Sequence, residues 1–263
     1  MKAKQWSSPA TTARVLELLA DLDWKSARIA DVGAGRGYFT RVLSDALART
    51  HGLVPREHLS ACDLRPEAFE FEGLTCERTS ADGRTPWPDN TFDAVVSIEV
   101  IEHVENQFEF LRELARIAKP GGLVIVTTPN VLNMNSRLRS LFVGFPLLFD
   151  PLPLKSPDPQ RLGGHIHPIS PYFLAYGALR AGLDSPRLVS DRLKHSAMFW
   201  TIALSPGLWV ARRLQRLRMG RKNPECLSDN RELLAAQESL ALWTGRTAMV
   251  AARKPVSPQA SAN

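Results

Sequence analysis

The stretch that decides the fold is Ala27-Arg28-Ile29-Ala30-Asp31-Val32-Gly33-Ala34-Gly35-Arg36-Gly37-Tyr38-Phe39-Thr40. A short apolar run with an acidic residue near its end leads into three glycines spaced G-x-G-x-G. Glycines let a ligand approach the backbone, and a following helix presents free N–H groups, so the pattern predicts a strand, a turn and a helix around a nucleotide-like ligand. The alternative is an ordinary glycine-rich turn between a strand and a helix.

The glycine spacing differs from that of a dinucleotide site. A dinucleotide fingerprint reads G-x-G-x-x-G and suits a pyrophosphate, whereas here the third glycine comes one residue early and Asp31 precedes the first. The segment resembles the first motif of class I S-adenosylmethionine-dependent methyltransferases, whose cofactor has no phosphate and carries a positively charged amino group. The resemblance implies that Gly33, Gly35 and Gly37 line the cofactor site and that Asp31 meets the positive charge.

Two later segments extend this resemblance. A second apolar run ends at Asp63-Leu64, where a carboxylate at the tip of the neighbouring strand suits both ribose hydroxyls. The resemblance assigns Asp63 to the ribose, with Leu64 beside it among the cofactor contacts, and Asp82 of the Ala81-Asp82 pair to the adenine amino group. Asp63 also suits a helix N-cap before Pro66, and Asp82 also suits a turn residue that bonds its own backbone.

The order of strands and helices predicts one elaborated domain over residues 1–254. Strands are expected near 27–32, 58–63, 75–79, 93–98, 122–128, 186–191 and 246–252, and helices near 9–22, 37–49, 66–71, 105–118 and 171–181. With the resemblance, this predicts an α/β fold: a Rossmann-like seven-stranded, mostly parallel sheet with helices on both faces and an antiparallel last strand. Two stretches exceed this scaffold, 130–170 and 195–243, and both are expected on the substrate side. Residues 255–263 are expected to form a disordered tail.

Composition favours a cytoplasmic enzyme. The 263 residues are 44% hydrophobic, enough for one sizeable core. The three cysteines show no C-x-x-C spacing, which argues against a disulfide framework or a thiolate metal site. The first residues lack the apolar region of a signal peptide, and no apolar run reaches the ~20 residues that cross a bilayer.

Positive charge gathers in the C-terminal part. Residues 1–185 hold 20 Lys and Arg against 22 Asp and Glu, whereas residues 186–263 hold 13 against 5. Six basic residues between Arg212 and Lys222 follow the apolar, Trp-containing stretch 197–210. This arrangement suits the interface of an anionic membrane, and such a cluster can also meet RNA phosphates. The alternative is a core helix followed by a solvated basic face.

The segment Glu99-Val100-Ile101-Glu102-His103 is the first candidate for the chemistry. "E-x-x-E-H" resembles the ubiquinone-biosynthesis O-methyltransferases and the small-RNA 2′-O-methyltransferases, in which related residues hold a divalent cation. Carboxylates and imidazole are suitable ligands for magnesium or manganese. In other relatives with this motif, the His and the first Glu line the cofactor pocket or cap the helix.

A second candidate follows the Thr127-Thr128-Pro129-Asn130 segment, in Gly164-His165-Ile166-His167-Pro168. The resemblance to bacterial class I methyltransferases favours His165 over His167 as the functional residue. An imidazole there can deprotonate a hydroxyl or complete a metal site of Glu99, Glu102, His103 and His165. A simple loop hydrogen bond is the alternative.

These observations predict methyl transfer from S-adenosylmethionine to a hydroxyl of a small or lipid-linked acceptor. His103, His165 and Glu99 are the candidate catalytic residues, and magnesium or manganese is an optional cofactor. An RNA methyltransferase is an alternative, but no recognisable RNA-binding module accompanies the basic charge, so nucleic acid is the less favoured partner. A catalytically silent cofactor-binding protein is a further alternative, which the complete Asp31, glycine and Asp63 set disfavours.

Overall fold

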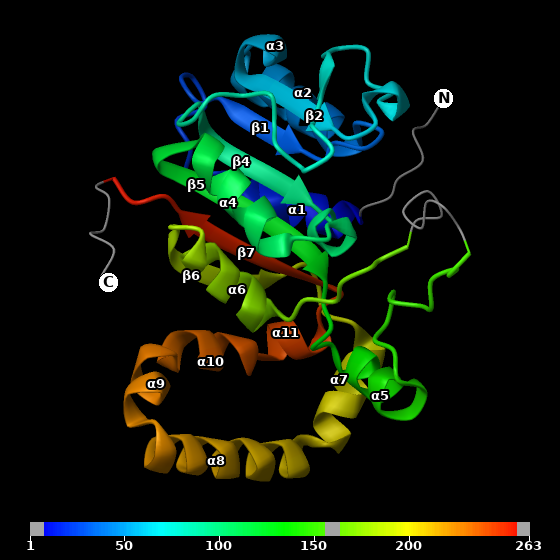
Figure 1. The fold of residues 1–263 in the computed structure, drawn as a ribbon, viewed down its shortest axis with the longest axis vertical. Helices are drawn as coiled ribbons and strands as arrows, with labels where there is room; N and C mark the ends of the chain where they lie inside the picture. Colours follow the sequence, from blue (N-terminus) through cyan, green and yellow to red (C-terminus); the bar gives the residue numbers. More distant parts are fainter. Residues whose placement is uncertain (1–7, 156–163, 257–263) are drawn as a thin grey trace.

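The computed structural model describes residues 8–155 and 164–256 as a three-layer α/β protein with an extra group of helices (Figure 1). Its strands are β1 (Ile29–Val32), β2 (Leu59–Asp63), β3 (Cys76–Arg78), β4 (Phe92–Ile98), β5 (Ala118–Pro129), β6 (Asp184–Ser190) and β7 (Thr247–Arg253). Its helices are α1 (Pro9–Leu18), α2 (Tyr38–His51), α3 (Pro55–His58), α4 (Gln107–Ile117), α5 (Met134–Val143), α6 (Pro171–Arg180), α7 (His195–Ala203), α8 (Ser205–Lys222), α9 (Pro224–Asp229), α10 (Arg231–Gln237) and α11 (Leu240–Thr244). The described residues also form two single 3-10 turns, η1 (Pro66–Ala68) and η2 (Ile101–His103).

The seven strands form one sheet in the order β3-β2-β1-β4-β5-β7-β6. The pairs from β3 to β5 are all parallel, and β7 is antiparallel to both β5 and β6. The predicted sheet, including the antiparallel last strand, is therefore confirmed. The strand order reverses between β1 and β4, which is where an open α/β sheet binds its ligand, beyond the carboxyl ends of the strands.

Helices cover both faces of the sheet, as expected. Helices α1 and α2 place Val15, Leu43 and Leu47 against one face, and α4 and α6 place Leu111 and Leu174 against the other. All five side chains are 0–1% exposed, and a fully buried aliphatic side chain contributes ~2 kcal/mol through the hydrophobic effect. The sheet and four helices thus form a rigid platform for the loops at the carboxyl edge.

Local sequence signals explain where these helices begin and end. The Ser8 hydroxyl caps α1 and Ser170 caps α6, each followed by proline in the first turn, which suits a helix start because proline lacks the N–H that would be unsatisfied there. Gly52 ends α2 in the left-handed conformation, at φ +66°. Two expected helices are shorter than predicted: α1 ends at Leu18, and 66–71 contains only the turn η1.

Of the two stretches beyond the scaffold, 195–243 is largely helical, whereas the described part of 130–170 holds the single helix α5. Along the chain, helix α5 follows β5, and helices α7 to α11 come after β6 and before β7 (Figure 1). Helices α5 and α7 pack together through Met134 and Ala197, with Trp243 of α11 in the same cluster. Helix α8 runs apart from the sheet, and none of its residues is buried. Residues 257–263 of the expected tail lie outside the described residues, whereas Lys254 is held by bonds to the carbonyls of Ala115 and Ala118.

Candidate active site

The three glycines of the first loop have different surroundings. All three adopt positive φ, at +77° for Gly33, +54° for Gly35 and +80° for Gly37, a conformation that disfavours other residues. A Cβ on Gly33 would overlap Val100, and a Cβ on Gly37 would lie 2.7 Å from the Phe69 ring, whereas a Cβ on Gly35 would meet no atom within 4 Å. Gly33 and Gly37 therefore allow close packing, and Gly35 faces open space that a ligand can fill.

Asp31 lies at the carboxyl end of β1 and is 4% exposed. Its Oδ2 accepts a 2.5 Å hydrogen bond from the Thr40 hydroxyl on α2. Burial raises the pKa of Asp31 to about 7, and repulsion from Asp63 adds to this rise against the lowering effect of Thr40. A buried carboxylate of this kind is stabilised by a cation, so it fits the charged amino group of S-adenosylmethionine. Sequence reasoning did not single out Thr40.

Asp63 reaches the glycine loop from the end of β2. Its Oδ2 accepts from the Gly35 N–H at 2.8 Å and its Oδ1 accepts from the Arg65 N–H at 2.8 Å. The second bond closes a local turn, whereas the N-cap that was the alternative for Asp63 is not formed, because Arg65 is the N-cap residue of η1 and η1 has no side-chain cap bond. Each Asp63 oxygen keeps a further lone pair for a hydroxyl donor. Leu64, next in the chain, is 45% exposed. These residues fit a ribose beside Gly35.

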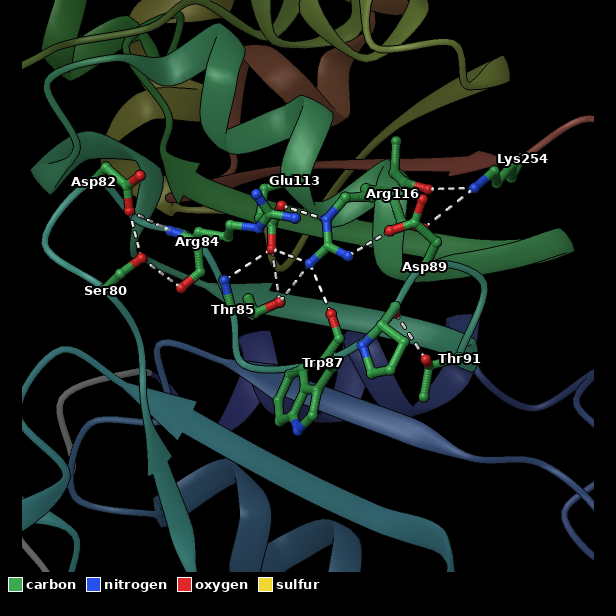
Figure 2. Close-up of polar contacts among 12 residues, drawn as sticks. Ser80, Asp82, Arg84, Thr85, Trp87, Asp89, Thr91, Glu113, Arg116 and Lys254 are labelled. Atoms are coloured by element: carbon green, nitrogen blue, oxygen red, sulfur yellow. Dashed lines mark hydrogen bonds and ion pairs between the residues drawn. The ribbon is translucent and has the colours of Figure 1, made fainter.

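Asp82 is engaged in its own turn. Its Oδ1 accepts from the Ser80 hydroxyl and, at 3.3 Å, from the Arg84 N–H (Figure 2). These bonds lower the pKa of Asp82. The turn residue that was the alternative reading is thus present, and the adenine role remains a prediction.

A salt-bridge network that sequence reasoning missed supports this loop. Arg116 on α4 bonds Glu113 at 2.6 Å and Asp89 at 2.6 Å, and donates to the Trp87 carbonyl at 2.8 Å (Figure 2). Glu113 also accepts from the N–H and hydroxyl of Thr85. The network ties loop 80–91 to α4. The i,i+3 spacing of Glu113 and Arg116 was the one signal available in the sequence.

Glu99 follows β4 with φ +54°, an uncommon value for a side chain of this size. Its Oε1 accepts from the Thr247 hydroxyl at 3.4 Å. Burial raises the pKa of Glu99, and the positive charge of Arg246 opposes that rise. Glu99 therefore faces the start of β7.

Glu102, His103 and His165 come together as a compact cluster. Their candidate ligand atoms all lie within 4.8 Å of one another. His103 Nδ1 donates to the Gly164 carbonyl at 2.9 Å, which makes Nε2 the basic nitrogen of the neutral ring. The structure thus brings together three of the four residues predicted to hold a metal, and Glu99 is not in the group.

Burial shifts the pKa of each member of the cluster. It raises the pKa of Glu102 to about 8, with a further contribution from Glu99. It lowers the pKa of His103, and lowers that of His165 to about 4 with help from the neighbouring His103. Among the described residues, neither carboxylate oxygen of Glu102 has a hydrogen-bond partner at standard geometry, and the nearby Thr128 hydroxyl partly opposes the rise in its pKa. A buried, unpaired carboxyl beside two imidazoles fits a divalent cation.

His167 lies outside this cluster. Its side chain is exposed, and its N–H donates to the Glu102 carbonyl at 3.1 Å. The Ile166 N–H donates to the same carbonyl at 2.9 Å. The segment after Gly164 is thereby fixed against η2, with His165 directed toward His103 at a ring separation of 4.8 Å. The geometry agrees with the choice of His165 over His167.

Two cavities differ in their relation to this edge of the sheet. A cavity of about 470 Å³ lies at the amino ends of β2 and β3, lined by Leu59 and Thr75 among others, and is remote from Asp31 and the His pair. A smaller one of about 110 Å³ lies at the end of β5, between Leu148 and Arg246. The smaller cavity is the one beside the candidate chemistry.

Comparisons with known proteins find methyltransferases. Residues 30–126 match the family model described as a methyltransferase domain. The chain is 30% identical over 132 residues to demethylmenaquinone methyltransferase of Tropheryma whipplei, covering 44% of this chain and 52% of that protein. It is 33% identical over 116 residues to ubiquinone biosynthesis O-methyltransferase of a Caulobacter species, covering 41% and 42%. The match spans about half or less of the length of these relatives.

A solved structure extends the likeness to the whole fold. The crystal structure of a S-adenosylmethionine-dependent methyltransferase from Archaeoglobus fulgidus superimposes with a TM-score of 0.55, at 15% identity and over 93% of each chain. At this identity the likeness shows the fold alone. Together with the match of residues 30–126 to a methyltransferase domain, it shows that the chain has the fold of an S-adenosylmethionine-dependent methyltransferase.

Proposed function

We propose that this protein transfers a methyl group from S-adenosylmethionine to a hydroxyl of a small or lipid-linked acceptor. The observation that carries the proposal is the buried Asp31 beside the open cradle at Gly35, which together fit a cationic cofactor without phosphate. When bound, S-adenosylmethionine supplies the methyl group to the acceptor oxygen and remains as S-adenosylhomocysteine. Two similar proteins are named demethylmenaquinone methyltransferase and ubiquinone biosynthesis O-methyltransferase, which supports a lipid-linked acceptor.

The chain's own residues supply positioning and proton removal. Asp31 holds the cofactor's amino group and Asp63 the ribose, which fixes the direction of attack. The hydroxyl proton passes to the neutral imidazole of His165 or His103, whose pKa values are lowered by burial so that both rings are uncharged near neutral pH. Glu99 stays beside Arg246 and Thr247 on the acceptor side.

Glu102, His103 and His165 are the residues that would hold magnesium or manganese. The metal would lower the pKa of the acceptor hydroxyl and so ease its deprotonation. If the metal takes both imidazoles, neither can serve as the base, so the two mechanisms exclude each other at full occupancy.

The acceptor proposal includes contact with an anionic membrane surface. Among the described residues, no helix has the length and apolarity to span a bilayer. Helix α8 nevertheless exposes Val210, Leu214 and Leu217, whose spacing places them on one side of the helix. The six basic residues of α8 are accompanied by no acidic residue within the helix. A basic helix with an exposed apolar stripe suits the headgroup region of an anionic bilayer.

Binding and product analysis test the proposed activity. Calorimetry is expected to show binding of S-adenosylmethionine and S-adenosylhomocysteine to the purified chain. Lipids and metabolites of cells with and without the gene are then compared for species that differ by the mass of one methylene. Absence of cofactor binding would overturn the proposal, and methylation of nitrogen alone would overturn the hydroxyl acceptor.

A further inference from the structure

The small cavity at the end of β5 combines two cations with an apolar wall. Lys194 and Arg246 supply its charged side chains, Leu147 and Leu148 supply apolar surface, and Pro129 closes the strand end. The volume of about 110 Å³ suits a small group of a larger ligand rather than a whole cofactor. It is therefore a candidate subsite for one part of the acceptor.

The backbone that carries both cations is firmly held. Asn130 and Asn133 each donate to the Gly245 carbonyl, at 3.0 and 2.9 Å. The Arg246 N–H donates to Asp191 at 3.0 Å, and the Lys194 N–H donates to the Thr244 carbonyl at 3.1 Å. The two asparagines in the cavity wall thus have structural partners for their amide groups, and the two cations project from a fixed frame.

The side chains of Lys194 and Arg246 have no acidic partner within 4 Å among the described residues. Asp191 is near, but its carboxylate accepts from the N–H groups of Arg246 and Thr247. Burial and the charges of Arg246 and Arg192 lower the pKa of Lys194, against a smaller opposing effect of Asp191. Two like charges held together without a close counterion favour an anion between them.

This cavity borders the candidate chemistry. The charge of Arg246 acts on both Glu99 and His165. The segment that leads to Leu148 also exposes the apolar side chains of Leu141, Phe142 and Phe145. An anion held at the two cations would leave the rest of the ligand between His165 and this apolar surface.

We propose that Lys194 and Arg246 bind an anionic group, a carboxylate or a phosphate, of the hydroxyl-bearing methyl acceptor. The inference rests on the proposed function and narrows its acceptor to an acidic molecule with an apolar body. Arginine favours bidentate pairing with either group, and lysine adds a point charge. Lys194 and Arg246 are thus specificity-determining residues of the acceptor site.

A pair of probes that differ only in charge tests this proposal. Calorimetry compares 3,4-dihydroxybenzoate with its neutral methyl ester, with and without S-adenosylhomocysteine, and inorganic phosphate is added as a competitor. The acid is expected to bind at least about tenfold more tightly than the ester. Lys194→Met and Arg246→Met are expected to abolish the preference, whereas Arg246→Lys keeps part of it.

Arg187→Gln is the matched control, because it removes one positive charge from the exposed face of β6, outside the cavity. It is expected to keep the preference for the acid. If phosphate displaces the acid from the wild type and this competition is lost in the same Met variants, the acceptor carries a phosphate group. If phosphate does not displace the acid, the acceptor carries a carboxylate. Equal binding of acid and ester, no binding of either anion, or a preference that survives both Met substitutions would overturn the inference. Anion binding by a chain that fails to bind S-adenosylmethionine would refute the proposed function alone.

Discussion

At the residue scale, Gly35 and Gly52 offer a matched pair. Both have positive φ, at +54° and +66°, and a Cβ on either would meet nothing within 4 Å. Gly35→Leu and Gly52→Leu should therefore each lose about 1–2 kcal/mol of unfolding free energy from backbone strain. Only Gly35→Leu places its side chain in the cofactor cradle, so only this variant should weaken S-adenosylmethionine binding, by at least about tenfold. Calorimetry and thermal unfolding of both variants measure the two effects.

Equal cofactor affinity in the two leucine variants would contradict this assignment. Gly35 would then be a turn glycine without contact to the ligand, which is the alternative that the sequence leaves open.

The metal prediction concerns Glu102. Its unpaired, fully buried carboxyl is the strongest argument for a cation. Glu102→Gln should weaken binding of Mn²⁺, measured by calorimetry or electron paramagnetic resonance, and chelation of the wild type should abolish turnover until magnesium or manganese is added back. His167→Gln is the control, because the exposed imidazole of His167 lies outside the cluster.

Full activity in excess chelator, or Mn²⁺ binding unchanged by Glu102→Gln, would exclude the metal. The imidazole base would then remain as the route for the proton.

The position of a site residue could be predicted where its type and its place at a strand end coincide, whereas its role stays a prediction. Asp31 and Asp63 each end a strand of recognisable pattern, so their meeting at the carboxyl edge follows from parallel pairing. Lys194 and Arg246 could not be found in this way, because they lie 52 positions apart and are brought together by tertiary contacts such as the bond from the Lys194 N–H to the Thr244 carbonyl and the bridge from Leu193 to Gly245. Pairing of this kind depends on tertiary contacts that no local pattern shows.

At the element scale, the two faces of α8 have different partners. Arg212 and Arg216 approach Glu238 at 3.6 and 2.6 Å, and Arg212 also lies over the Trp243 ring. Arg213 and Arg221 have no acidic partner within 4 Å among the described residues. The apolar stripe and these two arginines therefore form the face that we expect on a membrane.

Vesicle flotation tests this face. The wild type should float with vesicles containing anionic lipid at low salt and dissociate as salt rises. Arg213→Gln with Arg221→Gln should weaken binding by about 2 kcal/mol, roughly 30-fold, since each basic residue contributes about 1 kcal/mol. Arg212→Gln with Arg216→Gln removes the same charge from the inner face and should have a smaller effect.

Equal losses in the two double variants would indicate attraction by net charge alone. If the wild type stays in the soluble fraction at low salt, α8 does not bind the membrane, and its basic residues form a solvated face, which is the alternative given in the sequence analysis.

Element prediction was accurate for the strands and weaker for the short helices. Strand positions follow from apolar runs that end in turn residues, and all seven are confirmed. The expected helix at 66–71 is only a 3-10 turn, because the backbone of Phe69 is extended after Pro66–Ala68 and the Phe69 ring packs over Gly37. Tertiary packing overrides helix propensity in so short a segment.

At the scale of the whole molecule, the sheet places Asp31 where folding and cofactor binding favour different protonation states of its carboxyl. Folding favours the protonated form, and a bound cation favours the ionised form. The central strand β1 lies between β2 and β4, so the Asp31 carboxyl is desolvated and its pKa rises to about 7 from 3.8. The folded chain without ligand therefore binds a proton more tightly than the unfolded chain does. Stability is lost as pH rises from about 4 to about 7 and then stays level. A cation beside Asp31 favours the ionised form and reverses this loss.

Asp31→Asn tests this coupling, because the contributions of titrating groups that do not interact with Asp31 cancel when the variant is compared with the wild type. Without ligand, the wild type should lose unfolding free energy relative to the variant as pH rises from 4 to 7, by about 1–3 kcal/mol in total. The melting temperature of the variant should therefore rise relative to that of the wild type over this range, and the difference should persist above pH 7. S-adenosylmethionine should stabilise the wild type more at pH 8 than at pH 6 and should not stabilise the variant, since stabilisation follows affinity for the folded state. A pH-independent difference between the two chains, or a ligand-induced shift that survives in Asp31→Asn, would show that this carboxyl is neither the titrating group nor the partner of the cofactor's positive charge.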